Sequence, residues 1–281
     1  MLTTVARVKA ELRQSKDSVA PDATEERFIL ERIDETVDRI QTETGRQFAP
    51  VLDAKDFEPK SMQNGGLVFG DTLYLLNPLQ ELRGVTIDDT AVDLASIKTL
   101  PQSGDQIWRL QIQRGANWRT GDIIITGVWA YRTPSNDGWV DSLDTLQADI
   151  TDSDVFLTVS DADGYDSRFY APRFSPGQLI RLGDEYLQVR QINENNMGVI
   201  RGANGTTATA HTSGEPIMTW YPEPAIIRAA TRWATFMYRR RAHFETMQVE
   251  GMTAIEFPDD APPDVARIMN NYRKIGSIRR A

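Results

Sequence analysis

The sequence contains few residue patterns that could support catalysis. It has no cysteine and two histidines, and it lacks a G-x-S-x-G elbow, an H-E-x-x-H pair, a P-loop and a G-x-G-x-x-G segment that opens a helix. His211 and His243 fall in different predicted units, so a metal site built on both would require long-range convergence. We predict that His211 is a hydrogen-bonded turn residue and His243 an exposed helix-end residue. We therefore expect no catalytic residue, no cofactor and no metal: the chain is predicted not to be an enzyme.

Aspartates are concentrated in one segment. Residues 135–167 contain nine aspartates and neither lysine nor arginine, so this segment alone carries a charge of −9. Residues 161–166 (DADGYD) resemble half of a calcium loop, but no glutamate stands at the spacing that an EF-hand requires. Aspartate and glycine are also ordinary turn residues. We predict solvated turn carboxylates here and at Asp149, Asp152 and Asp154, with calcium binding, as in a metal-dependent enzyme, as the alternative.

Positive charge is concentrated near the carboxyl end. Residues 222–281 hold ten basic and seven acidic side chains. The arginines of its first helical stretch are Arg228, Arg232, Arg239, Arg240 and Arg241. Opposite charges on two patches can orient head-to-tail contacts between copies, so we predict that these arginines lie at an inter-subunit contact. The alternative is a solvated helix face with local glutamate partners.

Apolar spacing predicts helices at both ends of the chain and strands between them. Asp22 is placed to cap a helix that ends at Gly45, a second helical pattern follows Pro222, and a short one follows Pro262-Pro263. The strand-like runs are Leu73–Leu76, Val85–Ile87, Ile107–Ile112, Ile123–Trp129, Val155–Val159, Leu179–Leu182, Glu185–Ile192 and Met197–Ile200.

This order of elements predicts an α+β fold. We expect the terminal helices to form a small helical bundle with an antiparallel β-sheet region, and an all-β domain to be inserted into it. Residues 1–133 and 221–281 would form the core, and residues 134–220 the inserted domain. The chain of 281 residues is long enough for two domains, and its net charge of −9 argues against wrapping of nucleic acid. No apolar stretch approaches the length of a spanning helix, so we expect no membrane association and a soluble protein made without a signal.

Several segments, taken in order, resemble the head–tail connector (adaptor) proteins of tailed bacteriophages. Residues 42–48 (TETGRQF) are similar to the turn that closes the family's first helix pair, and residues 73–79 (LYLLNPL) followed by 85–89 (VTIDD) resemble its leucine-proline passage and strand. Residues 125–132 (ITGVWAYR) resemble a G-x-W-G-Y group, with Ala130 in place of glycine. Residues 224–241 look like its final helix. The β module at 134–220 departs from short family members.

The resemblance implies a structural protein of the virion neck, assembled in the bacterial host cytoplasm. Its copies would form a ring, commonly of twelve, that binds the portal protein and extends the DNA channel. The ring would also seat a head-closure or tail protein, and double-stranded DNA would pass without specific binding. We hypothesise that Asp88, Asp89 and Asp93 face the channel, because a carboxylate-rich wall repels a polyanion. We also hypothesise that the tail residues Ile275, Ile278, Arg279 and Arg280 dock on the portal.

A rival function uses the inserted β domain differently. A tail or host-surface binding protein would employ it as a recognition module. Its sign would be a shallow aromatic platform around Tyr165, Phe169 and Tyr170, whereas burial of these rings in a core would favour the adaptor.

Overall fold

The computed structural model describes residues 1–14, 22–57, 67–102, 106–113, 117–118, 121–133, 138–243 and 261–274. The chain divides into two compact units. The first comprises Met1–Gly45, Gly138–Ala203 and Thr207–Ala281, and the second comprises Arg46–Asp137 and Asn204–Thr206. No described helix combines the length and the apolarity that crossing a membrane requires.

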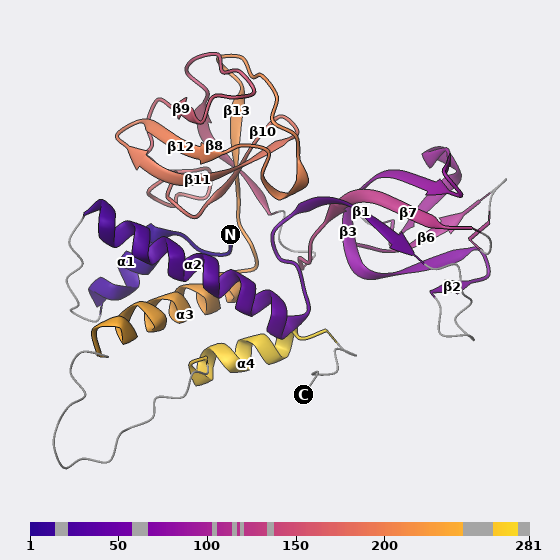
Figure 1. Cartoon of the computed structure of the whole chain (residues 1–281), viewed down its shortest axis with the longest axis horizontal. Helices are drawn as coiled ribbons and strands as arrows, with labels where there is room; N and C mark the ends of the chain where they lie inside the picture. Colours follow the sequence, from indigo (N-terminus) through magenta and orange to yellow (C-terminus); the bar gives the residue numbers. More distant parts are fainter. Residues whose placement is uncertain are drawn as a thin grey trace, which may run out of the picture. The chain divides into compact units, whose positions relative to one another are not determined.

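Helices from both ends of the chain pack on one another within the first unit (Figure 1). They are α1 (Val5–Gln14), α2 (Ala23–Thr44), α3 (Pro224–His243) and α4 (Pro263–Tyr272). Val8, Ile29 and Ala234, from three of these helices, are fully buried in one apolar cluster. The predicted ends of α2 are confirmed. The Asp22 carboxylate accepts hydrogen bonds from the amides of Thr24 and Glu25, and Gly45 ends the helix with a φ of 65°.

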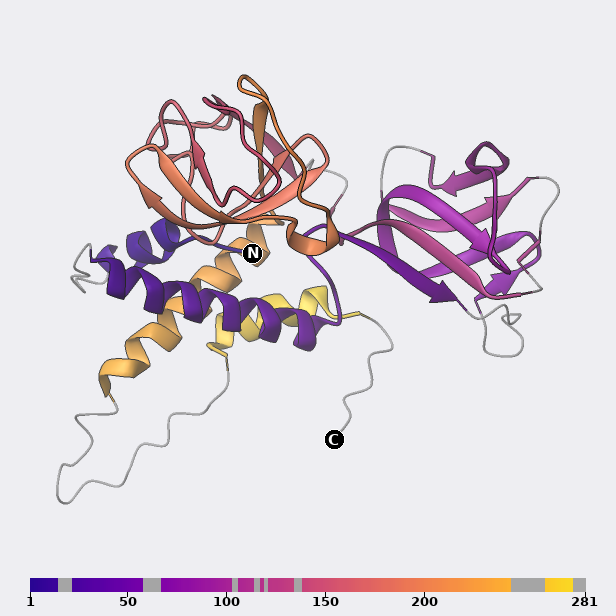
Figure 2. The ribbon, with the colours of Figure 1, turned by 45° about the horizontal axis from the view of Figure 1, so that its top comes forward.

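The first unit also contains a six-stranded antiparallel sheet in the order β8-β13-β10-β11-β12-β9. Its strands are β8 (Trp139–Thr145), β9 (Phe156–Thr158), β10 (Leu179–Leu182), β11 (Glu185–Asn193), β12 (Asn196–Ile200) and β13 (Pro216–Trp220). Gly183, with a φ of 51°, and Asp184 form the predicted tight turn between β10 and β11. The sheet curls (Figure 2), and the Gln147 amide donates to the Thr158 carbonyl, which brings the regions of the two edge strands together.

The second unit is a seven-stranded antiparallel sheet whose main order is β1-β7-β3-β6-β5. Its strands are β1 (Val51–Phe57), β2 (Val68–Phe69), β3 (Thr72–Ile87), β4 (Thr90–Ala91), β5 (Ile97–Leu100), β6 (Ile107–Ile112) and β7 (Ile123–Trp129). A short 3-10 helix, η2 (Leu94–Ser96), precedes β5. Leu73, Leu110, Trp118 and Ile125 are fully buried in its core.

The predicted fold class is wrong. Among the described residues, two large antiparallel sheets of seven and six strands dominate, with four helices, instead of a helical bundle with a smaller β region. One reason is that β3 is a single strand of 16 residues, where the apolar pattern predicts two separate runs. Pro78 lies where the pairing of β3 with β6 shifts register between Tyr74 and Leu79, and such an irregularity accommodates a proline inside a strand.

The observed units group the chain differently from the predicted domain boundaries. The six-stranded sheet lies within the predicted insertion, residues 134–220, but it belongs to the same compact unit as the helices. Residues 46–137, most of which belong to the predicted core of helices plus β-sheet, form the bulk of a unit of their own. Direct hydrogen bonds between the start of α1 and the loop before β10 account for this grouping.

Candidate functional site

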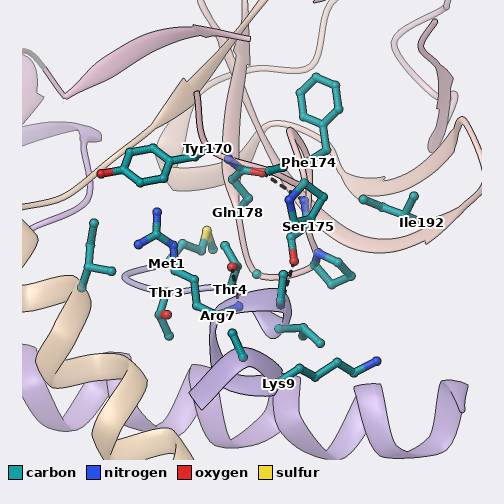
Figure 3. A pocket seen from close by; sticks show the side chains of 18 of the residues that line it. Met1, Thr3, Thr4, Arg7, Lys9, Tyr170, Phe174, Ser175, Gln178 and Ile192 are labelled. Carbon is teal, nitrogen blue, oxygen red and sulfur yellow. Dashed lines mark hydrogen bonds between the residues drawn. The ribbon is translucent and has the colours of Figure 1, made fainter. Parts of the chain in front are cut away.

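A groove of about 770 Å³ lies in the first unit between α1 and the loop that precedes β10. Arg7 and Lys9 enter it from the helix, and Tyr170, Phe174 and Gln178 line it from the sheet side (Figure 3). Its volume falls within the range of small-molecule sites, roughly 300–1,000 Å³. The cationic Lys9 Nζ lies 2.6 Å from the Glu26 carboxylate, so this charge is already paired.

The start of α1 is fixed to the sheet by hydrogen bonds. The Val5 amide donates to the Pro176 carbonyl at 2.9 Å, and the Ala6 amide donates to Ser175 Oγ at 3.1 Å. These bonds satisfy amides that the first turn of a helix leaves without partners. Gly177, with a φ of 91°, permits the close approach, because a Cβ there would lie 3.0 Å from the Thr3 carbonyl oxygen. The wall of the groove is therefore rigidly positioned.

Two arginines flank a buried tyrosine at one side of the groove. The Arg7 guanidinium carbon lies 5.4 Å from the centre of the Tyr221 ring and 5.5 Å from that of Tyr170. The Arg168 guanidinium carbon lies 5.6 Å from the centre of the Tyr221 ring. These distances suit cation–π attraction. Within the described part of the chain, no carboxylate forms a salt bridge with either arginine, but the Asp166 carboxylate binds the hydroxyl of the tyrosine that they flank.

Asp166 organises the turn that carries Arg168 and Tyr170. It is fully buried, and its carboxylate accepts hydrogen bonds from the Tyr221 hydroxyl at 2.7 Å and from the amides of Arg168 and Tyr170. Burial raises the pKa of the Tyr221 phenol, and the adjacent Asp166 carboxylate raises it further. Tyr221 thus remains a hydrogen-bond donor, and the turn is held in one conformation.

This turn exposes an aromatic side chain on a strained backbone. Phe169 has a φ of 63° and is 83% exposed. Leu143 on β8 repeats the combination, with a φ of 59° and 57% exposure. The Ser167 amide donates to the Asp141 carbonyl and links the two segments. A left-handed backbone disfavours side chains of both types, and neither side chain regains stability by burial here. Such outliers motivate a functional explanation.

We call Leu143, Tyr165, Phe169 and Tyr170 together the Phe169 surface. The tyrosines are 61% and 52% exposed. Exposure of the three aromatic rings of the Phe169 surface is the predicted sign of a recognition platform. The rings are exposed instead of buried in a core, which is the outcome expected for the recognition function and not for the adaptor.

The predicted half of a calcium loop is organised by an arginine. The buried Arg173 guanidinium donates to the Asp144 carboxylate at 2.9 Å and to the Asp161 and Tyr165 carbonyls at 2.8 to 3.1 Å. A guanidinium thus binds two backbone carbonyls of this loop and joins them to the Asp144 carboxylate. Burial of Asp144 opposes its ionisation and by itself would raise its pKa. Hydrogen bonds from Ser160, Asp161 and Thr145 stabilise the carboxylate more strongly, so the pKa of Asp144 is lowered. Asp166 is likewise buried, which corrects its prediction as a solvated turn residue.

The other turn aspartates are exposed, as predicted for Asp149, Asp152 and Asp154. Asp149 accepts a hydrogen bond from the Ser213 amide, and Asp154 from the Thr151 amide. Among the described residues, no group of three or more histidine, aspartate or glutamate side chains is arranged to hold a metal ion.

A second buried charge network braces the six-stranded sheet. Glu185 Oε1 and Oε2 accept from the Arg201 guanidinium at 2.7 and 2.8 Å, and Glu185 also accepts from the amides of Gly202 and Thr209. Burial opposes ionisation, but the Arg201 and amide bonds outweigh it and lower the pKa of Glu185 to about 2. His211 joins this network, with Nε2 3.0 Å from Glu185 and Nδ1 2.8 Å from Glu215. His211 is hydrogen-bonded as predicted, but it is buried and forms an isolated β-bridge with Ile150 instead of lying in a turn.

Arg232, one of the predicted inter-subunit arginines, is engaged inside the chain. Its guanidinium nitrogens lie 3.0 Å from the carboxylates of Glu11 on α1 and Asp264 on α4. Arg232 therefore joins α3 to α1 and α4. This pairing with carboxylates of the same chain is what we expect if Arg232 does not lie at an inter-subunit contact.

The other arginines of α3 differ in their surroundings. Arg240 stacks over the Phe236 ring, with 5.6 Å between the guanidinium carbon and the ring centre. Arg228 is exposed, and Arg239 is half-buried. The side chains of Arg241 and His243 lie outside the described residues.

The predicted channel acids have local structural roles in the second unit. Asp88 and Asp89 form the two-residue turn between β3 and β4, with φ values of 50° and 59°. The Asp93 carboxylate accepts from the Ala95 amide and caps η2. The predicted portal-binding residues lie in 275–281, outside the described residues. The roles of both sets in an assembly stay predictions.

Sequence patterns carry no local sign that Arg7, Arg168 and Tyr221 belong to one cluster. The contacts that bring these residues together are long-range, such as the hydrogen bond from the Tyr221 hydroxyl to Asp166, and the spacing of residues in the sequence does not predict them. Of the residues at this site, the sequence pointed to Tyr165, Phe169 and Tyr170, because aromatic residues in and just after an aspartate-rich segment stand out. A scan of protein-family models and a search of curated proteins both found no match to this chain.

Proposed function

We propose that this chain is a structural subunit of a tailed-phage neck, which forms a ring between the portal and the tail around the DNA channel. The observation that carries the proposal is the packing of helices from both ends of the chain on one another, because the resemblance rests on helical segments at both ends. The exposed rings of the Phe169 surface do not support it, since their exposure is the sign of the alternative function given below. The resemblance to head–tail connectors supplies the position in the virion.

The buried charges support a structural role for the first unit. Glu185 and Asp144 are each bound by an arginine and by backbone amides, so their ionised oxygens hold loops in place. In a reacting centre, an acid or base must be free to exchange a proton with a substrate. Neither carboxylate is placed for that task.

The test is binding to the portal protein of the same phage. The purified chain, mixed with assembled portal rings, is expected to co-sediment with them, whereas the chain alone stays in the supernatant. Absence of the chain from the portal pellet would refute the connector function. A variant that lacks residues 275–281 is expected to lose portal binding, and unchanged binding would refute only the role of the tail.

A second candidate function is recognition of a host surface or tail component through the six-stranded sheet. The exposure of Tyr165, Phe169 and Tyr170 favours it. Binding of the isolated chain to host cells, abolished by Phe169→Ala, would support this function over the connector.

A further inference from the structure

Three exposed aromatic rings belong to one short closed loop of the first unit. They are the rings of Tyr165, Phe169 and Tyr170. The Asp166 amide donates to the Tyr170 carbonyl at 3.1 Å, and the Phe169 amide donates to the Asp166 carbonyl at 2.9 Å. These bonds fold the main chain back on itself, so the three residues that carry the rings lie close together.

The two ends of this loop are held by other side chains. The buried Arg173 guanidinium donates to the Tyr165 carbonyl at 3.0 and 3.1 Å. The Tyr170 ring centre lies 5.9 Å from that of buried Tyr221, and the Arg7 guanidinium lies beside the Tyr170 ring (Figure 3). A ligand therefore meets rings on an ordered main chain, which lowers the conformational entropy that binding costs.

Charged groups of both signs stand among the rings. Asp141, Asp163 and Arg168 are exposed, and Arg7 is half-buried. Because acids lie beside the arginines, neither a polyanion nor a polycation meets a field of one sign. Charged side chains are also depleted from the cores of protein–protein contacts. A surface in which rings alternate with charges is thus unlike the centre of a contact with another folded protein.

These groups match the chemistry of a neutral sugar. The C–H face of a pyranose ring is apolar and packs on an aromatic ring, while its hydroxyls donate and accept hydrogen bonds. Exposed carboxylates such as Asp163 accept from hydroxyls, and the Arg168 guanidinium donates to them. Asp163 and Tyr170 also line the groove of about 770 Å³, so an oligosaccharide that covers the rings can continue into a concave site.

We propose that the Phe169 surface binds a neutral carbohydrate of the host cell surface. Tyr165 and Phe169 stack on sugar rings, and Asp163 accepts a hydroxyl hydrogen bond at the groove. The left-handed backbone of Phe169 then serves to present its ring to the sugar. The inference rests on the recognition function, the second candidate above, and deepens it by naming the class of ligand.

Chemical treatment of host cells identifies the class of ligand. Periodate cleaves the bond between two carbons that carry neighbouring hydroxyls and so destroys sugar rings, whereas proteinase K removes surface proteins. Binding of the purified chain is expected to fall at least about tenfold after periodate and to change less than about twofold after proteinase K. Polysaccharide extracted from the same cells and freed of protein is expected to compete for the chain. A several-fold rise in salt should change binding less than about twofold, because screening weakens only contacts between charges.

Substitutions locate the binding surface. Phe169→Ala and Tyr165→Ala are each expected to weaken binding to the extracted polysaccharide about tenfold, because each removes one stacking ring. Phe156→Ala is the matched control and should leave binding unchanged, since Phe156 is a 52% exposed ring of the same unit on β9, outside the Phe169 surface. All three side chains are exposed, so the variants are expected to fold, and denaturant unfolding checks this.

Three results would overturn the inference and leave the recognition function standing. Binding that survives periodate but is lost after proteinase K would indicate a protein receptor. Binding that is lost as salt rises would indicate a charged ligand. Equal effects of Phe169→Ala and Phe156→Ala would show that the sugar binds elsewhere. If the chain does not bind untreated host cells, the recognition function itself fails, and the inference fails with it.

Discussion

At the scale of single residues, Phe169 shows a conflict between local stability and exposure. A left-handed backbone costs a non-glycine residue about 1–2 kcal/mol, and the exposed ring recovers little of this by packing. The turn keeps this geometry because the buried Asp166 carboxylate binds the amides on both sides of Phe169. The strain is understandable if the ring is buried in an assembly.

Phe169→Asn is therefore expected to separate stability from association. Asparagine tolerates the left-handed region, so the free chain should be unchanged or stabilised by up to about 1 kcal/mol, while binding to host cells, the recognition function, weakens. Denaturant unfolding and a cell-binding assay measure the two effects, and Leu143→Asn, at the second left-handed position, shows whether the gain in stability is general. A loss of stability above about 1 kcal/mol would show that the ring already packs within the subunit.

Glu185 makes the stability of the six-stranded sheet dependent on pH. Because its pKa falls to about 2 in the folded state from an ordinary 4.5, its contribution is complete above about pH 4.5 and is lost as the pH falls toward 2. Glu185→Gln should cost roughly 3–5 kcal/mol at neutral pH, since Arg201 then stays buried without its carboxylate.

Hydrogen exchange of β10 to β12 between pH 2 and 6 measures both effects. The variant is expected to lose the part of the acid dependence that Glu185 contributes, while Asp144 and Glu215, whose pKa values are also lowered, keep theirs, and the exposed Asp152→Asn is the control. An equal acid dependence in wild type and Glu185→Gln would contradict the assignment.

The Arg173 guanidinium makes calcium unnecessary for the aspartate-rich loop. Millimolar Ca²⁺ is expected to leave the unfolding temperature of the wild type unchanged, whereas Arg173→Met should destabilise the first unit by roughly 3–5 kcal/mol through the unpaired Asp144. Calorimetry with and without Ca²⁺ tests this. A rise in unfolding temperature that saturates with Ca²⁺ in the wild type would favour the metal-loop alternative.

At the scale of elements, the position of α1 depends on Gly177. Gly177→Ala is expected to lose stability through both its positive φ and the contact of the new Cβ with the Thr3 carbonyl. Gly214→Ala is a matched control, because Gly214 has a φ of 90° and a Cβ added there would have no atom within 4 Å.

The loss for Gly177→Ala should exceed that for Gly214→Ala by about 1–3 kcal/mol, the usual cost of overpacking. Faster hydrogen exchange in α1 should accompany it. Equal losses for the two variants would show that the contact with α1 contributes nothing.

The elements that sequence predicts well are those fixed by local signals. Asp22 and Gly45 bound α2, and Gly183 with Asp184 turns β10 into β11, because capping and turn chemistry act within a few residues. The length of β3 was missed, since bulges that admit Pro78 depend on its partner strands. The Arg7 and Tyr221 cluster was missed for the same reason, because its members lie more than 200 positions apart.

At the scale of the whole molecule, the helices of both chain ends pack together, and the six-stranded sheet is joined to them in one unit. The Phe169 surface lies on this same unit, which is braced by the Glu185 and Asp144 networks. Sequence reasoning predicted the meeting of the chain ends but underestimated the β content, because each short apolar run proved to belong to one of two extended sheets.

Native mass spectrometry of portal rings mixed with the purified chain tests the central claim most directly. The account predicts complexes in which many copies of the chain, in a fixed number set by the symmetry of the ring, are bound to each portal assembly. Portal rings that carry no copy of the chain, at concentrations where both components are intact, would contradict it.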